Sequence, residues 1–314
     1  MHHYDCTCQG EGDFSKDCQH CGNAVVYADD STFTIVDKDP VILSDRLGEK
    51  FQLMADFLTS NKLKVNKDKT HLLLMCTKQR RHKLNNEVVV RADNHVVRVS
   101  ESERLLGVYI HGNMKWNENI RDNKNALLHS LNFRLGGLKK IASATCFKTR
   151  LAVANGIFMS KLTFMIPLWA GCSDYLVKAL QVSQNNAARF VTRHGKSVSV
   201  KQLLKECGWR SVKQEIFYHS VLLVHKILLH QSPSYLHSQI TADGNYQYGT
   251  RAASVSSIRQ SQSFRTNLTL CKDSFRWRAV ASYEQLPKNL REMENIGAFK
   301  NNLNLWVKKN ISPM

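Results

Sequence analysis

The sequence predicts an α+β fold, with antiparallel β-structure in the first third of the chain and helices in the rest. Two pairs of apolar, β-branched runs each enclose turn residues: residues 24–26 and 31–36, and residues 88–90 and 96–97. Such pairs predict β-hairpins. From Trp116 onward, leucines and other apolar residues recur at helical spacing over long segments, which predicts an all-α region.

The segment after the first hairpin predicts a helix packed on a sheet. Residues 37–40 form a turn, and Ser44 is the expected N-cap of a helix that ends near Ser60-Asn61. Its apolar positions repeat at helical spacing and form one buried face: Leu47, Phe51, Met54 and Leu58. An apolar strand at residues 71–75, the second hairpin and a strand over residues 103–110 complete this part, with a turn at Gly112-Asn113.

The remaining two thirds predict four helices and a tail. The first helix ends at Gly136-Gly137, the second spans residues 147–165 and is closed by Pro167, the third begins at Asp174, and the fourth follows Trp209. The helical spacing also predicts the apolar faces of three of these helices: Ile120, Leu127, Leu128, Leu131 and Leu135 in the first; Leu176, Val177, Leu180, Ala187, Phe190 and Val191 in the third; and Ile216, Phe217, Val221, Leu222, Val224 and Leu228 in the fourth. The helical period fades over residues 232–262, which predicts a linker before a last helix through Phe299, Leu303 and Trp306.

Composition favours a polyanionic partner. The 314 residues are 43% hydrophobic, and 44 Lys and Arg against 26 Asp and Glu give a net charge of +18 and a pI near 9.6. Binding to nucleic acid uses such an excess, although a basic surface also keeps proteins soluble. The chain opens on a polar, cysteine-rich stretch, so no signal peptide is expected, and the uncharged run at residues 162–173 is too short to span a bilayer. The expected location is intracellular, nuclear or cytoplasmic, with no secretion and no membrane partner.

The nine cysteines are unevenly distributed. Four of them lie within the first 22 residues, at spacings that suit a tetrahedral Zn²⁺ site: Cys6, Cys8, Cys18 and Cys21. Unligated or reactive thiols are the alternative. The other five are expected at ordinary buried positions: Cys76, Cys146, Cys172, Cys207 and Cys271.

The sequence Tyr27-Ala28-Asp29-Asp30 places two adjacent carboxylates at the tip of the first predicted hairpin. Carboxylates in a turn, with no Lys or Arg beside them, suit a hard divalent cation such as Mg²⁺ or Mn²⁺. Enzymes that transfer phosphoryl groups use such cations in pairs. The alternative is an ordinary acidic turn, because Asp is a favoured turn residue.

Three elements in order extend this motif into a resemblance. Tyr27, Asp29 and Asp30 are followed by Asn66-Lys67-Asp68-Lys69-Thr70 and then by Leu106-Gly107-Val108 with Trp116. The run from residue 24 to about residue 120 thereby resembles the second half of the palm domain of reverse transcriptases from non-LTR (LINE-like, jockey- or CR1-type) retrotransposons. The helical region resembles the thumb of the same elements, through pieces such as Gln184-Asn185-x-Ala187-Ala188-Arg189 and Gly208-Trp209.

The resemblance implies an RNA-directed DNA polymerase with an RNA template and a DNA primer as partners. Asp29 and Asp30 would hold Mg²⁺ or Mn²⁺, Tyr27 would position the hairpin and the nucleotide, and Lys69 would assist the leaving group. Leu106 and Gly107 would belong to the primer grip. Thumb contacts to phosphates would come from basic residues of the helices: Lys139, Lys140, Lys148, Arg150 and Arg189. The implied organisation is a Cys-rich segment (1–22), a partial palm (23–118), a helical thumb and post-thumb (119–231), and a linker with a C-terminal helical tail (232–314).

A two-metal site also needs a carboxylate on a neighbouring strand. In the family this Asp lies well upstream, and the 26 residues before Tyr27 contain no apolar strand that bears one. The expectation is therefore a C-terminal polymerase fragment that is inactive alone. Two alternatives are a nucleic-acid-binding relic or domesticated protein without catalysis, and a relic that never folds stably.

Overall fold

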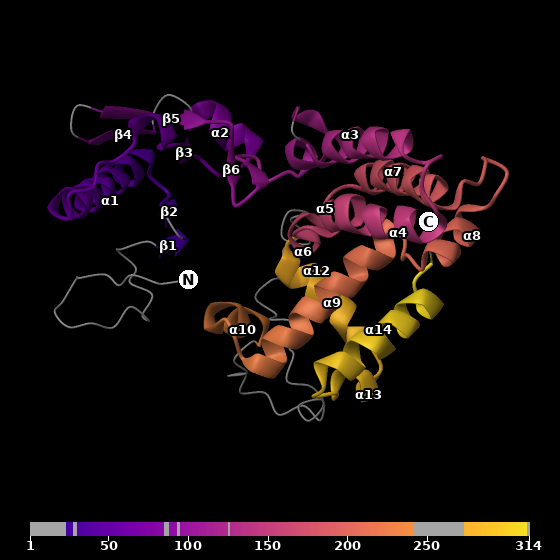
Figure 1. Cartoon of the computed structure of the whole chain (residues 1–314). Helices are drawn as coiled ribbons and strands as arrows, with labels where there is room; N and C mark the ends of the chain where they lie inside the picture. The colour runs from indigo at the N-terminus through magenta and orange to yellow at the C-terminus, as the bar shows by residue number, and fades with distance from the viewer. Residues whose placement is uncertain are drawn as a thin grey trace, which may run out of the picture. The chain divides into compact units, whose positions relative to one another are not determined.

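The computed structural model describes residues 23–27, 30–84, 88–92, 95–124, 126–241 and 273–312. The fold is mixed α+β, as the sequence predicts. The chain divides into two compact units (Figure 1): unit 1 contains the described residues up to Leu105 together with Ile110–Met114, and unit 2 contains Leu106–Tyr109 and the described residues from Lys115 onward.

Both predicted hairpins of unit 1 are confirmed. Strand β1 (Asn23–Tyr27) pairs antiparallel with β2 (Asp30–Thr34), in a register that sets Tyr27 opposite Asp30. Strand β4 (Val89–Ala92) pairs antiparallel with β5 (His95–Ser100), which also pairs in parallel with β3 (Leu72–Leu73). Unit 1 therefore contains a separate two-stranded sheet and a three-stranded sheet of order β3-β5-β4.

Helix α1 (Pro40–Ser60) follows the first hairpin and packs against β4. Its N-cap is Asp39, and the prediction of Ser44 is wrong. Asp39 Oδ1 accepts hydrogen bonds from Val41 N at 2.8 Å and Ile42 N at 3.4 Å. Pro40 fits the first turn because its fixed φ is already helical and its missing N–H is not needed there. Ser44 lies one turn later, where its hydroxyl donates to the Pro40 carbonyl.

Arg81 holds the strands of unit 1 together from helix α2 (Lys78–Leu84). Its side chain is buried, and Nη2 donates to Ser100 O at 2.9 Å, while Nη1 lies 3.4 Å from Leu74 O. Gly112 makes room for this guanidinium, because a Cβ at that position would lie 1.6 Å from Arg81 Nη1.

The predicted single strand over residues 103–110 is wrong, because the chain reverses within it. Strands β6 (Ser102–Leu105) and β7 (Val108–His111) form a hairpin. Its two turn residues, Leu106 and Gly107, have φ values of 48° and 86°. Positive φ at both central residues is the geometry of a type I′ turn, whose twist matches that of paired strands.

Unit 2 is helical. The helical elements before residue 193 are η2 (Glu118–Asp122), α3 (Leu127–Lys140), α4 (Phe147–Ala154), η3 (Asn155–Met159), α5 (Ser160–Thr163), α6 (Ile166–Trp169) and α7 (Asp174–Thr192). They are followed by α8 (Val200–Cys207), α9 (Val212–His230), α10 (Ser234–Ile240), α12 (Phe275–Glu284), α13 (Lys288–Arg291) and α14 (Ile296–Asn310).

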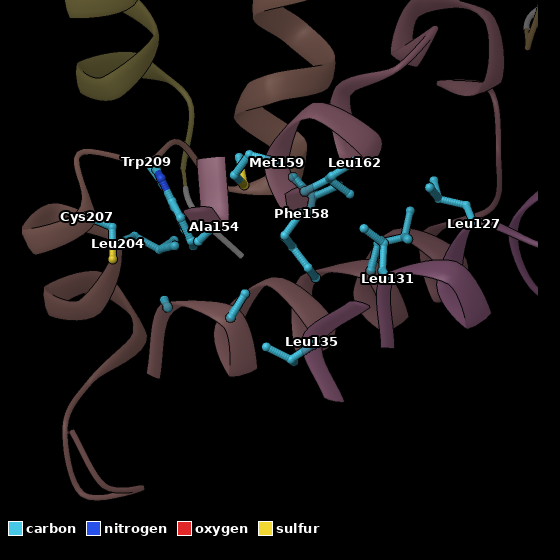
Figure 2. Packing of buried hydrophobic residues seen from close by; sticks show 14 of the residues in the cluster. Leu127, Leu131, Leu135, Ala154, Phe158, Met159, Leu162, Leu204, Cys207 and Trp209 are labelled. Atoms are coloured by element: carbon cyan, nitrogen blue, oxygen red, sulfur yellow. The ribbon is translucent and has the colours of Figure 1, made fainter. Parts of the chain in front are cut away.

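The first core of unit 2 lies between α3, α7 and the run from α4 to α5. Figure 2 shows Leu131 and Leu135 of α3 on one side of this core and Phe158 on the other. The predicted apolar face of α3 is therefore confirmed at these leucines, and all six predicted positions of α7 are buried. Trp209 enters the same core, where its Nε1 donates to Asn155 Oδ1 at 2.8 Å.

The second core forms where α12 and α14 pack against α9. It confirms the buried positions Phe217, Val221 and Val224 of the predicted fourth helix and Phe299 and Leu303 of the last helix. Trp306 is half-buried and stacks on Phe217, with ring centroids 5.5 Å apart.

Three boundaries in unit 2 differ from prediction. Gly136-Gly137 lie inside α3, because the packing of Leu135 and Leu138 outweighs the cost of about 1 kcal/mol for each helical glycine. The helical run from residue 147 ends at Thr163, and Pro167 stands in the first turn of α6 instead of closing it. Helix α10 occupies the start of the predicted linker, and residues 242–262 lie outside the described part of the chain.

The cysteines divide by burial. Cys207 is buried, Cys76 and Cys172 are half-buried, and Cys146 is exposed, so the prediction of a buried position is wrong for Cys146. Cys271 and the four cysteines of the predicted zinc site, Cys6, Cys8, Cys18 and Cys21, lie outside the described residues.

Candidate functional site

Two side chains at the end of the β1–β2 hairpin are open to solvent. Tyr27 is 54% exposed and Asp30 is exposed. No ion pair within the described ranges involves Asp30. Asp29 and Ala28 lie outside the described residues. The Asp30 carboxylate is therefore accessible to a cation from solution.

Asn66 organises the Asn-Lys-Asp-Lys-Thr segment around the short helix η1 (Lys67–Lys69). Its side-chain Oδ1 accepts from Asp68 N at 3.1 Å, and its carbonyl accepts from Lys69 N at 3.2 Å and from Thr70 Oγ1 at 2.9 Å. Such bonds from an Asn side chain to the backbone two residues on stabilise a turn. They leave the Lys69 side chain exposed.

Of the two predicted metal-binding carboxylates, the structure describes that of Asp30, and Asp30 is not bonded to Lys69. The hairpin and β3, the strand after Lys69, belong to different sheets. No hydrogen bond or ion pair in the described part of the chain links Asp30 with Lys69. Nor does that part contain a group of three or more His, Cys, Asp or Glu side chains able to hold a metal ion. Asp30 offers the hard oxygen ligand that Mg²⁺ prefers, but as a single described ligand.

The Leu106-Gly107 turn is backed by a small cavity in unit 2. A Cβ on Gly107 would lie 3.5 Å from Phe164 Cε1. The cavity behind it measures about 20 Å³, which is room for one water molecule and too little for a nucleotide. Asn119 in its wall was missed by the sequence reasoning: its Oδ1 accepts from Tyr109 N at 3.1 Å and so holds β7 against η2.

The predicted phosphate contacts separate into exposed and buried residues. Lys139 and Lys140 at the end of α3 and Lys148 in α4 are exposed. Arg150 is 6% exposed, its Nε donates to Val191 O at 2.8 Å, and its Nη1 bonds to Ala142 O and Thr145 O. The prediction of Arg150 as a phosphate contact is therefore wrong, because its guanidinium is used inside unit 2. Arg189 is half-buried, and its Nε is buried without a hydrogen-bond partner among the described residues.

None of the described helices has the length and apolar composition needed to cross a bilayer. Compared with protein-family models, with curated proteins and with solved structures, the chain matches none. A function for this chain must therefore be inferred from its own residues and structure.

Proposed function

We propose that the chain is part of the reverse transcriptase of a non-LTR retrotransposon, and that the β1–β2 hairpin contributes Asp29 and Asp30 to a two-metal centre for nucleotidyl transfer. The supporting observation is the strand register. Tyr27 pairs with Asp30 at the end of the ladder, so the Tyr-x-Asp-Asp sequence spans the turn of an antiparallel hairpin, with both described side chains exposed.

Each side chain has a role that its chemistry can perform. The Asp30 carboxylate, with that of Asp29, binds divalent cations, which supply Lewis-acid activation of a 3′-hydroxyl and an α-phosphate when bound. The exposed ammonium group of Lys69 offsets the negative charge that develops on the leaving pyrophosphate. Tyr27, which pairs with Asp30 across the two strands, positions the hairpin and the incoming nucleotide.

Metal binding tests the hairpin directly. We expect Mn²⁺, followed by the relaxation of water protons, to bind the intact chain at a site that is lost in Asp30→Asn. Asp45→Asn is the matched control, because Asp45 is an exposed carboxylate of α1 in the same unit. Equal Mn²⁺ binding by both variants and by the unaltered chain would mean that the hairpin is an ordinary acidic turn.

Primer extension tests catalysis. We expect no template-dependent incorporation by this chain alone, because a two-metal centre also needs a carboxylate on a neighbouring strand, and in the described residues β1 and β2 pair only with each other. Incorporation with Mg²⁺ or Mn²⁺ that disappears in Asp29→Asn would contradict that expectation and would make this chain a complete catalyst.

A nucleic-acid-binding protein without catalysis is the second candidate. The net charge of +18 and the exposed Lys139, Lys140 and Lys148 favour it. Tight binding of nucleic acid with a steep salt dependence, together with no loss of Mn²⁺ binding in Asp30→Asn, would support this second function over the first.

A further inference from the structure

The outer face of α3 has a composition that its own fold does not explain. Leu127, Leu131, Leu135 and Leu138 are buried and form the inner face. On the opposite side, residues at spacings of four, three and four share one exposed stripe: His129, Phe133, Gly136 and Lys140. In Figure 1, α3 lies beside α7 within the helical unit. The Ser183 hydroxyl of α7 donates a hydrogen bond to Asn132 Oδ1 of α3 at 2.9 Å.

Phe133 is the most solvent-exposed aromatic ring in the described part of the chain, with 85% of its surface exposed. One turn further, a Cβ on Gly136 or on Gly137 would meet no atom within 4 Å. The packing of unit 2 therefore needs neither glycine, although each weakens the helix. The stripe combines an open aromatic face with a stretch of bare helix backbone, which lets another molecule approach closely.

The segment that contains this stripe carries basic side chains and no acidic ones. From Asn123 to Ser173 the sequence contains no Asp or Glu, although these residues number 26 in the whole chain. The same stretch carries Lys139 and Lys140 at the end of α3 and Lys148 in α4, all exposed. A helix whose exposed residues include lysines and no carboxylates favours a polyanion over another basic surface.

We propose that the His129–Phe133–Gly136–Lys140 stripe of α3 binds single-stranded nucleic acid, with one base stacked on Phe133, the strand lying over Gly136, and phosphates neutralised by Lys139 and Lys140. A base offers its flat face to a protruding ring when it is not already stacked within a duplex, so the exposed Phe favours a single strand. The site rests on the second proposed function, nucleic-acid binding, and specifies where the strand lies; it depends on α3 and not on metal binding by the hairpin.

Removing the ring tests the stacking. In anisotropy titrations with a fluorescent single-stranded oligonucleotide of mixed sequence, we expect Phe133→Ala to weaken binding about five- to 150-fold, the range measured for one stacked base. Binding of the matching duplex is expected to change less than twofold. Leu305→Ala is the matched control, since Leu305 is 67% exposed on α14 of the same unit. Equal single-strand affinities of the two variants, or an equal loss for the duplex, would overturn the proposal.

Gly136→Ala tests whether the strand lies close to the helix backbone, because this substitution is expected to raise stability and to lower single-strand affinity. The added methyl group meets no neighbour in the chain, so the melting temperature of unit 2 is expected to rise. The same methyl group stands between the strand and the helix, so single-strand affinity is expected to fall. Lys140→Gln is expected to reduce the slope of log affinity against log salt by about 0.7. A more stable Gly136→Ala variant with unchanged affinity would show that the strand does not lie over this turn of α3.

Discussion

His225 should make the stability of unit 2 depend on pH. It lies in α9 with 3% of its surface exposed, and its ring stacks on Phe299 of α14, with centroids 3.6 Å apart and planes at 9°. Its Nδ1 lies 3.0 Å from the Tyr283 hydroxyl of α12. Burial lowers the pKa of His225 below its usual value, the Met293 backbone acts in the opposite direction, and His230 lowers the pKa further.

The direction in which the free energy of unfolding changes with pH follows from proton binding. Because the pKa of His225 is lower in the folded chain than the value of about 6.5 in the unfolded chain, the unfolded chain binds more protons below that pH. The contribution of His225 to the free energy of unfolding is therefore complete above about pH 6.5 and is lost as the pH falls below it. One group changes this free energy by at most about 1.4 kcal/mol per pH unit, and the loss ends at the pKa of the folded state.

Urea unfolding from pH 8 to pH 5 measures this slope. All five tryptophans belong to unit 2, so their fluorescence follows that unit alone: Trp116, Trp169, Trp209, Trp277 and Trp306. His225→Phe keeps an aromatic ring against Phe299 and removes the titration, so the difference between the unaltered chain and this variant isolates His225. His129→Asn, an exposed histidine of α3, is the control. A difference that stays constant from pH 8 to pH 5 would show that the folded and unfolded chains bind the same number of protons at His225.

Two further substitutions and one labelling experiment address features of both units. Arg150→Ala should lower the free energy of unfolding of unit 2 by about 1–3 kcal/mol, because it leaves buried carbonyls without donors. Lys148→Ala, at an exposed position of the same helix, should change this free energy by less than about 0.5 kcal/mol. Similar losses for the two variants in urea titrations would show that the Arg150 hydrogen bonds do not stabilise unit 2. Asp39→Ala should cost about 1 kcal/mol in unit 1 through loss of the α1 cap, measured by far-ultraviolet circular dichroism, and an unchanged midpoint would contradict it. Cys146 should react with maleimide before Cys207, because a hydrogen bond from the Thr149 side chain lowers the pKa of the exposed Cys146 thiol while burial raises the pKa of Cys207 to about 12. Peptide mapping by mass spectrometry reads the order, and faster labelling of Cys207 would be the opposite result.

Periodicity predicted the elements whose side chains sort cleanly between core and solvent. The β1–β2 and β4–β5 hairpins and the inner faces of α3 and α7 follow from the sequence, because alternation or a 3.6-residue repeat directly reflects burial. The exposure of Asp30 at a hairpin end was likewise predictable from its place between two apolar runs.

Reversals made by unusual residues were not predictable. Leu106 takes a positive φ that a leucine rarely adopts, so the β6–β7 turn looks like the middle of a strand over residues 103–110. The sequence predicts a helix end at Gly136-Gly137, but α3 continues through both glycines. Glycines usually end helices, but these two lie on the outer face of α3, whose inner face is held in place by buried leucines. In α3, packing of the leucines overrides the local preference of the glycines.

The basic residues show most clearly what the sequence hides. Arg150 and Arg81 look like any other basic residue in the chain, yet both are buried and donate to carbonyls near the ends of helices or strands. Arg150 binds Val191 O in the last turn of α7 and Ala142 O just after α3, where helix carbonyls lack intrahelical donors and a positive charge is favoured. Arg81 does the same for the carbonyls of Leu74 and Ser100 beside β3 and β5. Part of the positive charge thus holds the fold together, and the charge left for a polyanion is the exposed part, which on α3 includes Lys139 and Lys140.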